Sequence, residues 1–167
     1  MIETLNFRQL PRPLLRAVKL PPQIAYAIRR DPLIGRLILL LTTTGRRTGL
    51  PRVTPLQYEE IDGAYYIGSA RGLDADWVRN ILADPHVQVR VKAQHFDGLA
   101  EVTTDRARIT AFLALRLQRH PHMVGALLRA EGLTQPPTRA QLEAYGARLA
   151  LVIIRPAAER HTSFSGW

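Results

Sequence analysis

Short strand-like segments joined by tight turns dominate the middle of this 167-residue sequence. Segment 86–92 alternates most clearly, with valine at every second position of its middle and polar side chains between. The dipeptide Asp62-Gly63 is a strong signal for a two-residue hairpin turn. A pattern of about six strands joined mostly by such turns predicts an antiparallel sheet or small barrel. The expected strands are 36–44, 52–60, 64–69, 86–92, 96–102 and 149–154.

Helical segments are inserted between the later strands. Asp76 is the expected N-cap of a helix over 77–83, and a second helix opens at Thr104 or Asp105 and ends at His120. Further helices are expected at about 122–131 and 138–147. The unbroken apolar run 149–154 predicts a strand that is buried on both faces. The fold class is therefore α+β, mainly antiparallel β, with helices packed on the sheet.

The chain is expected to contain a single domain with two flanking segments. Residues 36–155 form the predicted domain, and the polar tail 156–167 follows it. Residues 1–35 are predicted to form a partly helical arm, in which prolines and arginines recur. This arm has two interpretations: it covers the core of its own domain, or it makes peripheral contact with a membrane surface.

Charge and composition narrow the possible functions. The chain carries 23 basic and 14 acidic residues, a net charge of +9, which favours polyanionic partners. Because there is no cysteine, disulfides, thiolate metal sites and cysteine nucleophiles are excluded. We see neither a signal peptide nor an apolar run near the roughly 20 residues of a membrane span. A soluble, cytoplasmic protein is expected.

Two basic turns are candidate anion sites. In the first, Gly45 and Gly49 enclose Arg46, Arg47 and Thr48, and Arg52 follows closely. Exposed backbone N–H groups beside guanidinium groups are suited to bind an anion. The alternative interpretation of this segment is an ordinary basic hairpin tip in water. The second turn contains Ser69 and Arg71, and it is followed by Trp77 and Asn80. Trp77 is interpreted either as the wall of a ring-binding site or as part of the core.

No constellation for hydrolysis or metal binding is visible. The five histidines lack ligand spacing and are expected at the surface, so no metal site is predicted. Glu59 and Glu60 are neighbours on a predicted strand, so their carboxylates point to opposite faces and cannot work as a pair. No G-x-S-x-G motif or dinucleotide fingerprint occurs. Any difficult chemistry is thus expected to belong to a cofactor.

The order of these motifs resembles the deazaflavin-dependent nitroreductase family of the flavin/deazaflavin oxidoreductases. The string Thr42-Thr43-Thr44-Gly45-Arg46-Arg47-Thr48-Gly49 is followed by Pro51-Arg52, the Ser69 turn, Trp77 with Asn80, and Asp84-Pro85. The resemblance covers roughly residues 36–103 and implies a split β-barrel and the coenzyme F420. F420 is a 5-deazaflavin with a phosphodiester and a polyglutamate tail. The binding residues that the resemblance implies are Arg46, Arg47, Thr48, Gly49, Arg52, Ser69, Arg71, Trp77 and Asn80.

The resemblance also implies a reaction. Reduced F420 would deliver hydride to an electron-poor acceptor such as a nitroaromatic, quinone or enone. The resemblance implies that the two basic turns line one groove for the coenzyme. Tyr58 is the best candidate proton donor, with a barrel-lining aromatic as its alternative role. Split barrels commonly pair, so a homodimer is expected. Asp74 and Asp76 add negative charge near this groove.

The sequence is also compatible with two alternative functions. FMN could replace F420, because related split barrels hold FMN through a phosphate site. A nonenzymatic basic module for nucleic acid is the second alternative. It is disfavoured because no nucleic-acid motif is recognised and aromatic residues make up only 7% of the chain, so we expect a small-molecule partner and no nucleic acid.

Overall fold

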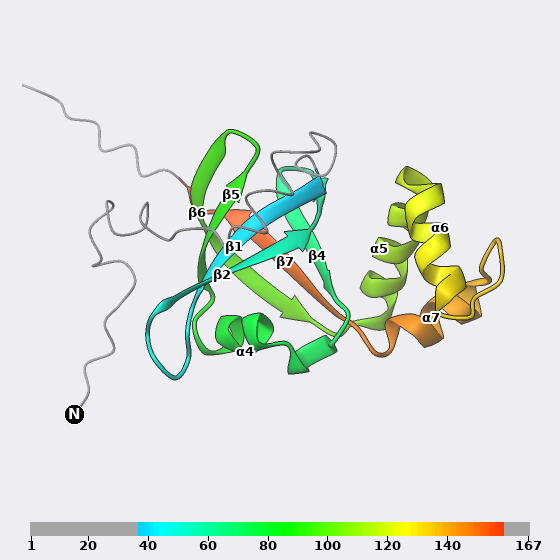
Figure 1. The fold of residues 1–167 in the computed structure, drawn as a ribbon, viewed down its shortest axis with the longest axis horizontal. Helices are drawn as coiled ribbons and strands as arrows, with labels where there is room; N and C mark the ends of the chain where they lie inside the picture. Colours follow the sequence, from blue (N-terminus) through cyan, green and yellow to red (C-terminus); the bar gives the residue numbers. More distant parts are fainter. Residues whose placement is uncertain (1–36, 159–167) are drawn as a thin grey trace, which may run out of the picture.

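The computed structural model describes residues 37–158, which form one curled antiparallel sheet with helices at one end and on one outer face (Figure 1). The sheet has seven strands in the order β2-β1-β5-β6-β7-β4-β3. The expected α+β class is confirmed. The arm 1–35 and residues 159–167 of the tail lie outside the described residues, and the domain boundaries stay a prediction.

The elements follow the expected order. The strands are β1 (Ile38–Thr44), β2 (Pro51–Gln57), β3 (Glu59–Ile61), β4 (Ala64–Ser69), β5 (His86–Val91), β6 (Gln94–Thr103) and β7 (Ala150–Pro156). The helices are η2 (Gly72–Asp74), a short 3-10 helix, and α4 (Asp76–Ala83), α5 (Arg106–Arg119), α6 (Pro121–Ala130) and α7 (Arg139–Gly146).

The expected single strand 52–60 is wrong, because the chain divides there into β2 and β3. β2 pairs with β1 and β3 pairs with β4, and these two short strands form the opposite edges of the sheet. Only Tyr58 separates them, and its backbone N–H donates to the carbonyl of Leu37 at 3.3 Å. Because a single residue links the two edge strands, the sheet must curl, and it forms a split barrel. The sheet has seven strands, one more than expected.

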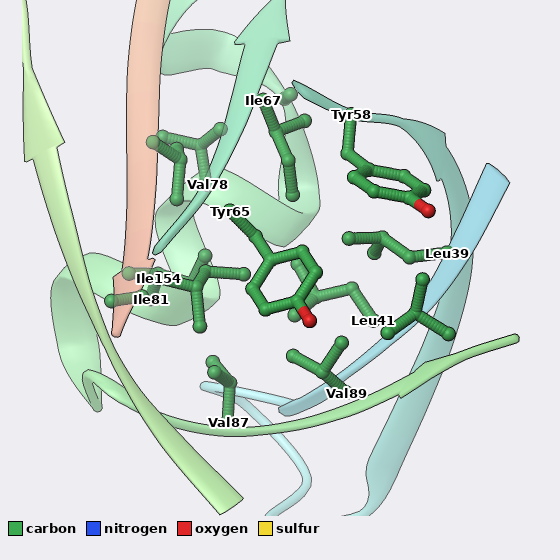
Figure 2. Packing of buried hydrophobic residues seen from close by; sticks show 14 residues of the cluster. Leu39, Leu41, Tyr58, Tyr65, Ile67, Val78, Ile81, Val87, Val89 and Ile154 are labelled. Carbon is green, nitrogen blue, oxygen red and sulfur yellow. The ribbon is translucent and has the colours of Figure 1, made fainter. Parts of the chain in front are cut away.

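An inner core fills the barrel, and α4 closes one end of it. Leu39 and Leu41 of β1 meet Val78 and Ile81 of α4 in one buried cluster. Figure 2 shows these side chains converging with Tyr65 and with Val87 and Val89 of β5. The alternation in segment 86–92 is confirmed, because Val87, Val89 and Val91 all lie in this cluster.

A second core lies outside the barrel, beneath the layer of α5, α6 and α7 that Figure 1 shows beside β7. Leu151 and Ile153 of β7 belong to this outer core, whereas Val152 and Ile154 belong to the inner one. The prediction that this apolar strand is buried on both faces is confirmed. The α5 residues of the outer core are Ile109, Phe112 and Leu113.

A buried carboxylate ties α5 to the edge strand β3. Glu59 is 4% exposed, and its carboxylate contacts Arg116 Nε at 3.3 Å and Arg119 at 3.2 Å. His120 Nε2 lies 3.0 Å from the same carboxylate, so this histidine is not simply at the surface as expected. Glu60 is exposed, which confirms that the two neighbouring carboxylates face opposite ways.

Candidate functional site

A cavity of about 420 Å³ lies between the β1–β2 hairpin and the start of α4. Two segments distant in the sequence build it: the basic turn with the beginning of β2, and the first half of α4. Its lining residues are Gly45, Arg46, Arg47, Thr48, Arg52, Val53, Thr54, Asp76, Trp77 and Asn80.

Two glycines give the hairpin its shape. The N–H of Gly45 donates to the carbonyl of Leu50 at 2.8 Å, and the N–H of Gly49 donates to the carbonyl of Gly45 at 2.7 Å. Gly49 has a φ of +68°, which favours glycine, and a Cβ at Gly45 would lie only 3.0 Å from the carbonyl oxygen of Leu50. The expected turn between these glycines is therefore present.

Arg46 is held in place from the buried side of the cavity. Asn80 is 4% exposed, and its Oδ1 accepts hydrogen bonds from the Arg46 guanidinium at 3.0 Å and from the Arg46 backbone N–H at 3.2 Å. The Asn80 Nδ2 in turn donates to the hydroxyl of the fully buried Thr43 at 3.1 Å. Asn80 therefore connects β1, α4 and the basic turn.

Asp76 contacts the same guanidinium from the solvent side. Its Oδ1 lies 2.9 Å from the second terminal nitrogen of Arg46. The hydrogen bond from Arg46 lowers the pKa of Asp76 below its ordinary value, and the charges of Arg46, Arg71 and Arg79 act in the same direction. Asp76 was expected to cap the helix, but α4 begins at Asp76 itself with Ala75 as its N-cap, because the carboxylate binds Arg46 instead.

Arg47, Thr48 and Arg52 provide the accessible polar groups of the cavity. All three are exposed and line the cavity. Within residues 37–158, no carboxylate lies within ion-pair distance of Arg47 or Arg52. Two guanidinium groups and one hydroxyl therefore face the space between the hairpin and α4. Such a donor set suits a phosphate or carboxylate.

Four residues that the sequence predicts for the site do not line this cavity in the described part of the chain, residues 37–158. Ser69 is 2% exposed, and its hydroxyl donates to the carbonyl of Gly72 at 2.8 Å. Arg71 is exposed, and its positive charge acts on Asp76. Gly49 shapes the turn without lining the cavity. The binding roles of these three residues stay predictions.

Tyr58, the fourth, lies in the inner core. It is 6% exposed, and its ring centroid is 5.6 Å from that of Tyr65. Figure 2 shows the two tyrosines among the buried side chains of the cluster. Burial, followed by the nearby charge of Glu60, raises the pKa of Tyr58. This placement agrees with the barrel-lining alternative, and the proton-donor role stays a prediction.

A protein-family comparison matches the region that builds this cavity. The family model described as F420H(2)-dependent quinone reductase matches residues 27–122, more than half of the chain. The chain belongs to this family. The resemblance to deazaflavin-dependent oxidoreductases is thereby confirmed, and the matched region includes every residue that lines the cavity.

Curated members of the quinone reductase family share part of the sequence. An F420H(2)-dependent quinone reductase of Mycobacterium tuberculosis is 39% identical over 66 residues, which cover 38% of this chain and 44% of that protein. A putative F420H(2)-dependent quinone reductase of Mycobacterium bovis matches with the same values. The match therefore spans less than half of the length of these relatives.

Solved structures confirm the fold of this family member. A structure described as an F420-H2 dependent reductase has a TM-score of 0.50 at 24% identity and covers 72% of this chain and 95% of its own. A conserved hypothetical protein from Mycobacterium tuberculosis has a TM-score of 0.54 at 18% identity, with coverage of 83% and 81%. At these identities the likeness shows the split-barrel fold alone.

The sequence alone does not reveal the roles of two residues that organise this site, Asp76 and Thr43. The sequence predicts Asp76 as a helix cap and as a negative charge near the groove, but not as the partner of Arg46. Thr43 enters the prediction only as part of the motif shared with the family. The sequence does hold a signal for the link between Asp76 and Asn80, because residues four positions apart share a helix face.

Among residues 37–158, no group of three or more histidine, aspartate or glutamate side chains is placed to hold a metal ion. No helix in that same range is long and apolar enough to cross a membrane.

Proposed function

We propose that this protein is an F420-dependent oxidoreductase that reduces quinone-like, electron-poor small molecules. The observation that carries the proposal is the arginine-lined cavity within the segment that the quinone reductase family shares. The mycobacterial relatives are named for this activity. Quinones are the favoured acceptors for that reason, and nitroaromatics and enones share the same electron-poor chemistry.

The donors in the cavity fit the coenzyme. F420 carries a phosphodiester and several carboxylates, so it needs more than one cationic contact. Arg47 and Arg52 supply guanidinium forks, and Thr48 supplies a hydroxyl. Charge-assisted hydrogen bonds of this kind are about twice as strong as neutral ones.

Several residues of the chain then have defined tasks. Arg47, Arg52 and Thr48 would bind the anionic part of the coenzyme, and Trp77 would provide an apolar wall of the cavity. Asn80 keeps Arg46 and the hairpin in position through its three hydrogen bonds. When bound, the coenzyme supplies the hydride for the acceptor. The protein contributes orientation of the two reactants and exclusion of water.

Titration of the purified protein with F420 and with FMN, followed by tryptophan fluorescence, tests the choice of coenzyme. We expect F420 to bind more tightly than FMN, since FMN has one terminal phosphate and needs fewer arginines. Tighter binding of FMN would remove the F420 assignment. Binding of neither coenzyme, together with tight and length-dependent DNA binding at physiological salt, would support the nucleic-acid module instead.

Mixing the protein with reduced F420 and a panel of acceptors tests the reaction. We expect the absorption band of oxidised F420 to return at a rate that depends on the acceptor, fastest with quinones. Equal rates with and without the protein would refute the enzymatic proposal.

The proposal includes a homodimer in the cytoplasm. A solved structure with a TM-score of 0.50 and 21% identity is described as a domain-swapped dimer, which is consistent with pairing in this fold. Light scattering during size-exclusion chromatography measures the mass directly. A mass near twice 18.8 kDa supports the dimer, and a mass near 18.8 kDa refutes it.

A further inference from the structure

Within residues 37–158, the charged side chains that line the cavity are three arginines and a single carboxylate. This carboxylate belongs to Asp76, whose side chain is 78% exposed and lies 2.9 Å from Arg46. A negative charge at the rim of a site that binds anions repels the ligand and therefore has to be explained.

Asp76 is not the sole support of Arg46. One terminal nitrogen of the guanidinium donates to Asn80 Oδ1 at 3.0 Å, and the other donates to Asp76 Oδ1 at 2.9 Å. The backbone N–H of Arg46 is also bound by Asn80, at 3.2 Å. Since Asn80 is 4% exposed and Asp76 is largely exposed, the buried amide provides the firmer anchor. The carboxylate mainly offsets the charge of Arg46.

We propose that Asp76 weakens the binding of anions in this cavity by neutralising Arg46. Arg47 and Arg52 then supply most of the positive charge that a ligand meets. The consequence for the coenzyme rests on the proposed function, whereas the consequence for a simple anion does not.

Asp74 offers a matched control. Its side chain is 76% exposed, nearly the same as that of Asp76, and it pairs with Arg79 at 2.7 Å. It lies two positions away in the sequence but does not line the cavity within the described residues. D76N and D74N therefore remove the same charge from the same segment, and only D76N removes it from the cavity.

The experiment compares wild type, D74N and D76N with two ligands. Affinity for F420 is measured by fluorescence, and affinity for inorganic pyrophosphate is measured from the backbone amide NMR shifts of the hairpin. Asparagine at position 76 keeps an oxygen that accepts from Arg46. At low salt we expect D76N to bind each ligand about three- to fivefold more tightly than wild type, with a clearly smaller change in D74N. Raising the salt to about 1 M should remove most of the difference, because the Debye length falls to about 3 Å.

Each other outcome has a definite meaning. Weaker binding by D76N would show that Asp76 holds Arg46 for the ligand and would overturn the proposal. Equal gains in D74N and D76N would assign the effect to overall charge, which overturns it too. Failure of all three proteins to bind F420 refutes the proposed function, and the pyrophosphate arm still decides the role of Asp76. Failure of all three to bind pyrophosphate at low salt shows that the cavity is no anion site and also overturns the proposal.

Discussion

The side-chain amide of Asn80 donates a hydrogen bond to the hydroxyl of Thr43, with 3.1 Å between Nδ2 and Oγ1. The two residues are 37 positions apart, and both are buried. This bond joins the first strand of the barrel to the helix that closes it. The Oδ1 of Asn80 also accepts hydrogen bonds from Arg46, so the basic turn belongs to the same polar unit.

Asn80→Ala is expected to destabilise the protein by about 1–3 kcal/mol, because it leaves the buried hydroxyl of Thr43 without this partner and frees Arg46. Urea denaturation measures the change. Gln88→Ala is the matched control, since Gln88 donates to Asp97 at 3.0 Å on the exposed outer surface. The control is expected to change stability by no more than about 0.5 kcal/mol. Equal losses in the two variants would contradict a structural role for the buried amide.

Glu59→Ala is expected to cost about 3 kcal/mol, because it removes the buried carboxylate that contacts the Arg116 and Arg119 guanidinium groups and the His120 ring. Glu60→Ala is the control on the neighbouring residue. Glu60 is 47% exposed and lies 4.0 Å from Lys92, so its removal should cost about 0.5 kcal/mol or less. Thermal or urea denaturation of both variants checks the difference, and comparable stabilities would argue against the buried cluster.

Arg52→Ala is expected to weaken F420 binding by about 1.5–3 kcal/mol, which is roughly 10- to 150-fold in the dissociation constant. The physical reason is the loss of a charged hydrogen bond inside the cavity that Arg52 lines. Arg90→Ala removes the same charge from an exposed position of β5 outside that lining and should leave binding nearly unchanged. An unaltered dissociation constant for the Arg52 variant would remove this residue from the site.

Stability should depend on pH through Glu101. Hydrogen bonds from Arg108 and Arg155 lower the pKa of this carboxyl in the folded state below 4.5. A lowered pKa stabilises the fold at pH values above that of the unfolded carboxyl, and the contribution disappears as the pH falls through the folded value. Wild type should therefore exceed E101Q in stability near neutral pH, and the gap should close in acid. Denaturation curves at a series of pH values measure this gap; a gap that is constant with pH would contradict the prediction.

Much of the fold could be predicted because its signals are local. The valines of segment 86–92, the Asp62-Gly63 turn and the apolar run 149–154 each act over a few residues, and each is confirmed. The break at Tyr58 could not be predicted in this way. Nothing in segment 52–60 indicates that its two halves pair with different partners, β1 and β4, since that choice depends on closure of the whole sheet.

The basic turn, with its glycines, arginines and spacing, is determined by the sequence alone, and so is the resemblance that places the chain among F420-dependent reductases. Only the tertiary structure decided which of those residues share a cavity. It brings Asp76 and Asn80 against Arg46, across 30 and 34 positions, and it directs Ser69 and Tyr58 into buried positions. The physical reason is that backbone conformation follows from neighbouring residues, whereas the partner of a side chain depends on how the strands and α4 pack together.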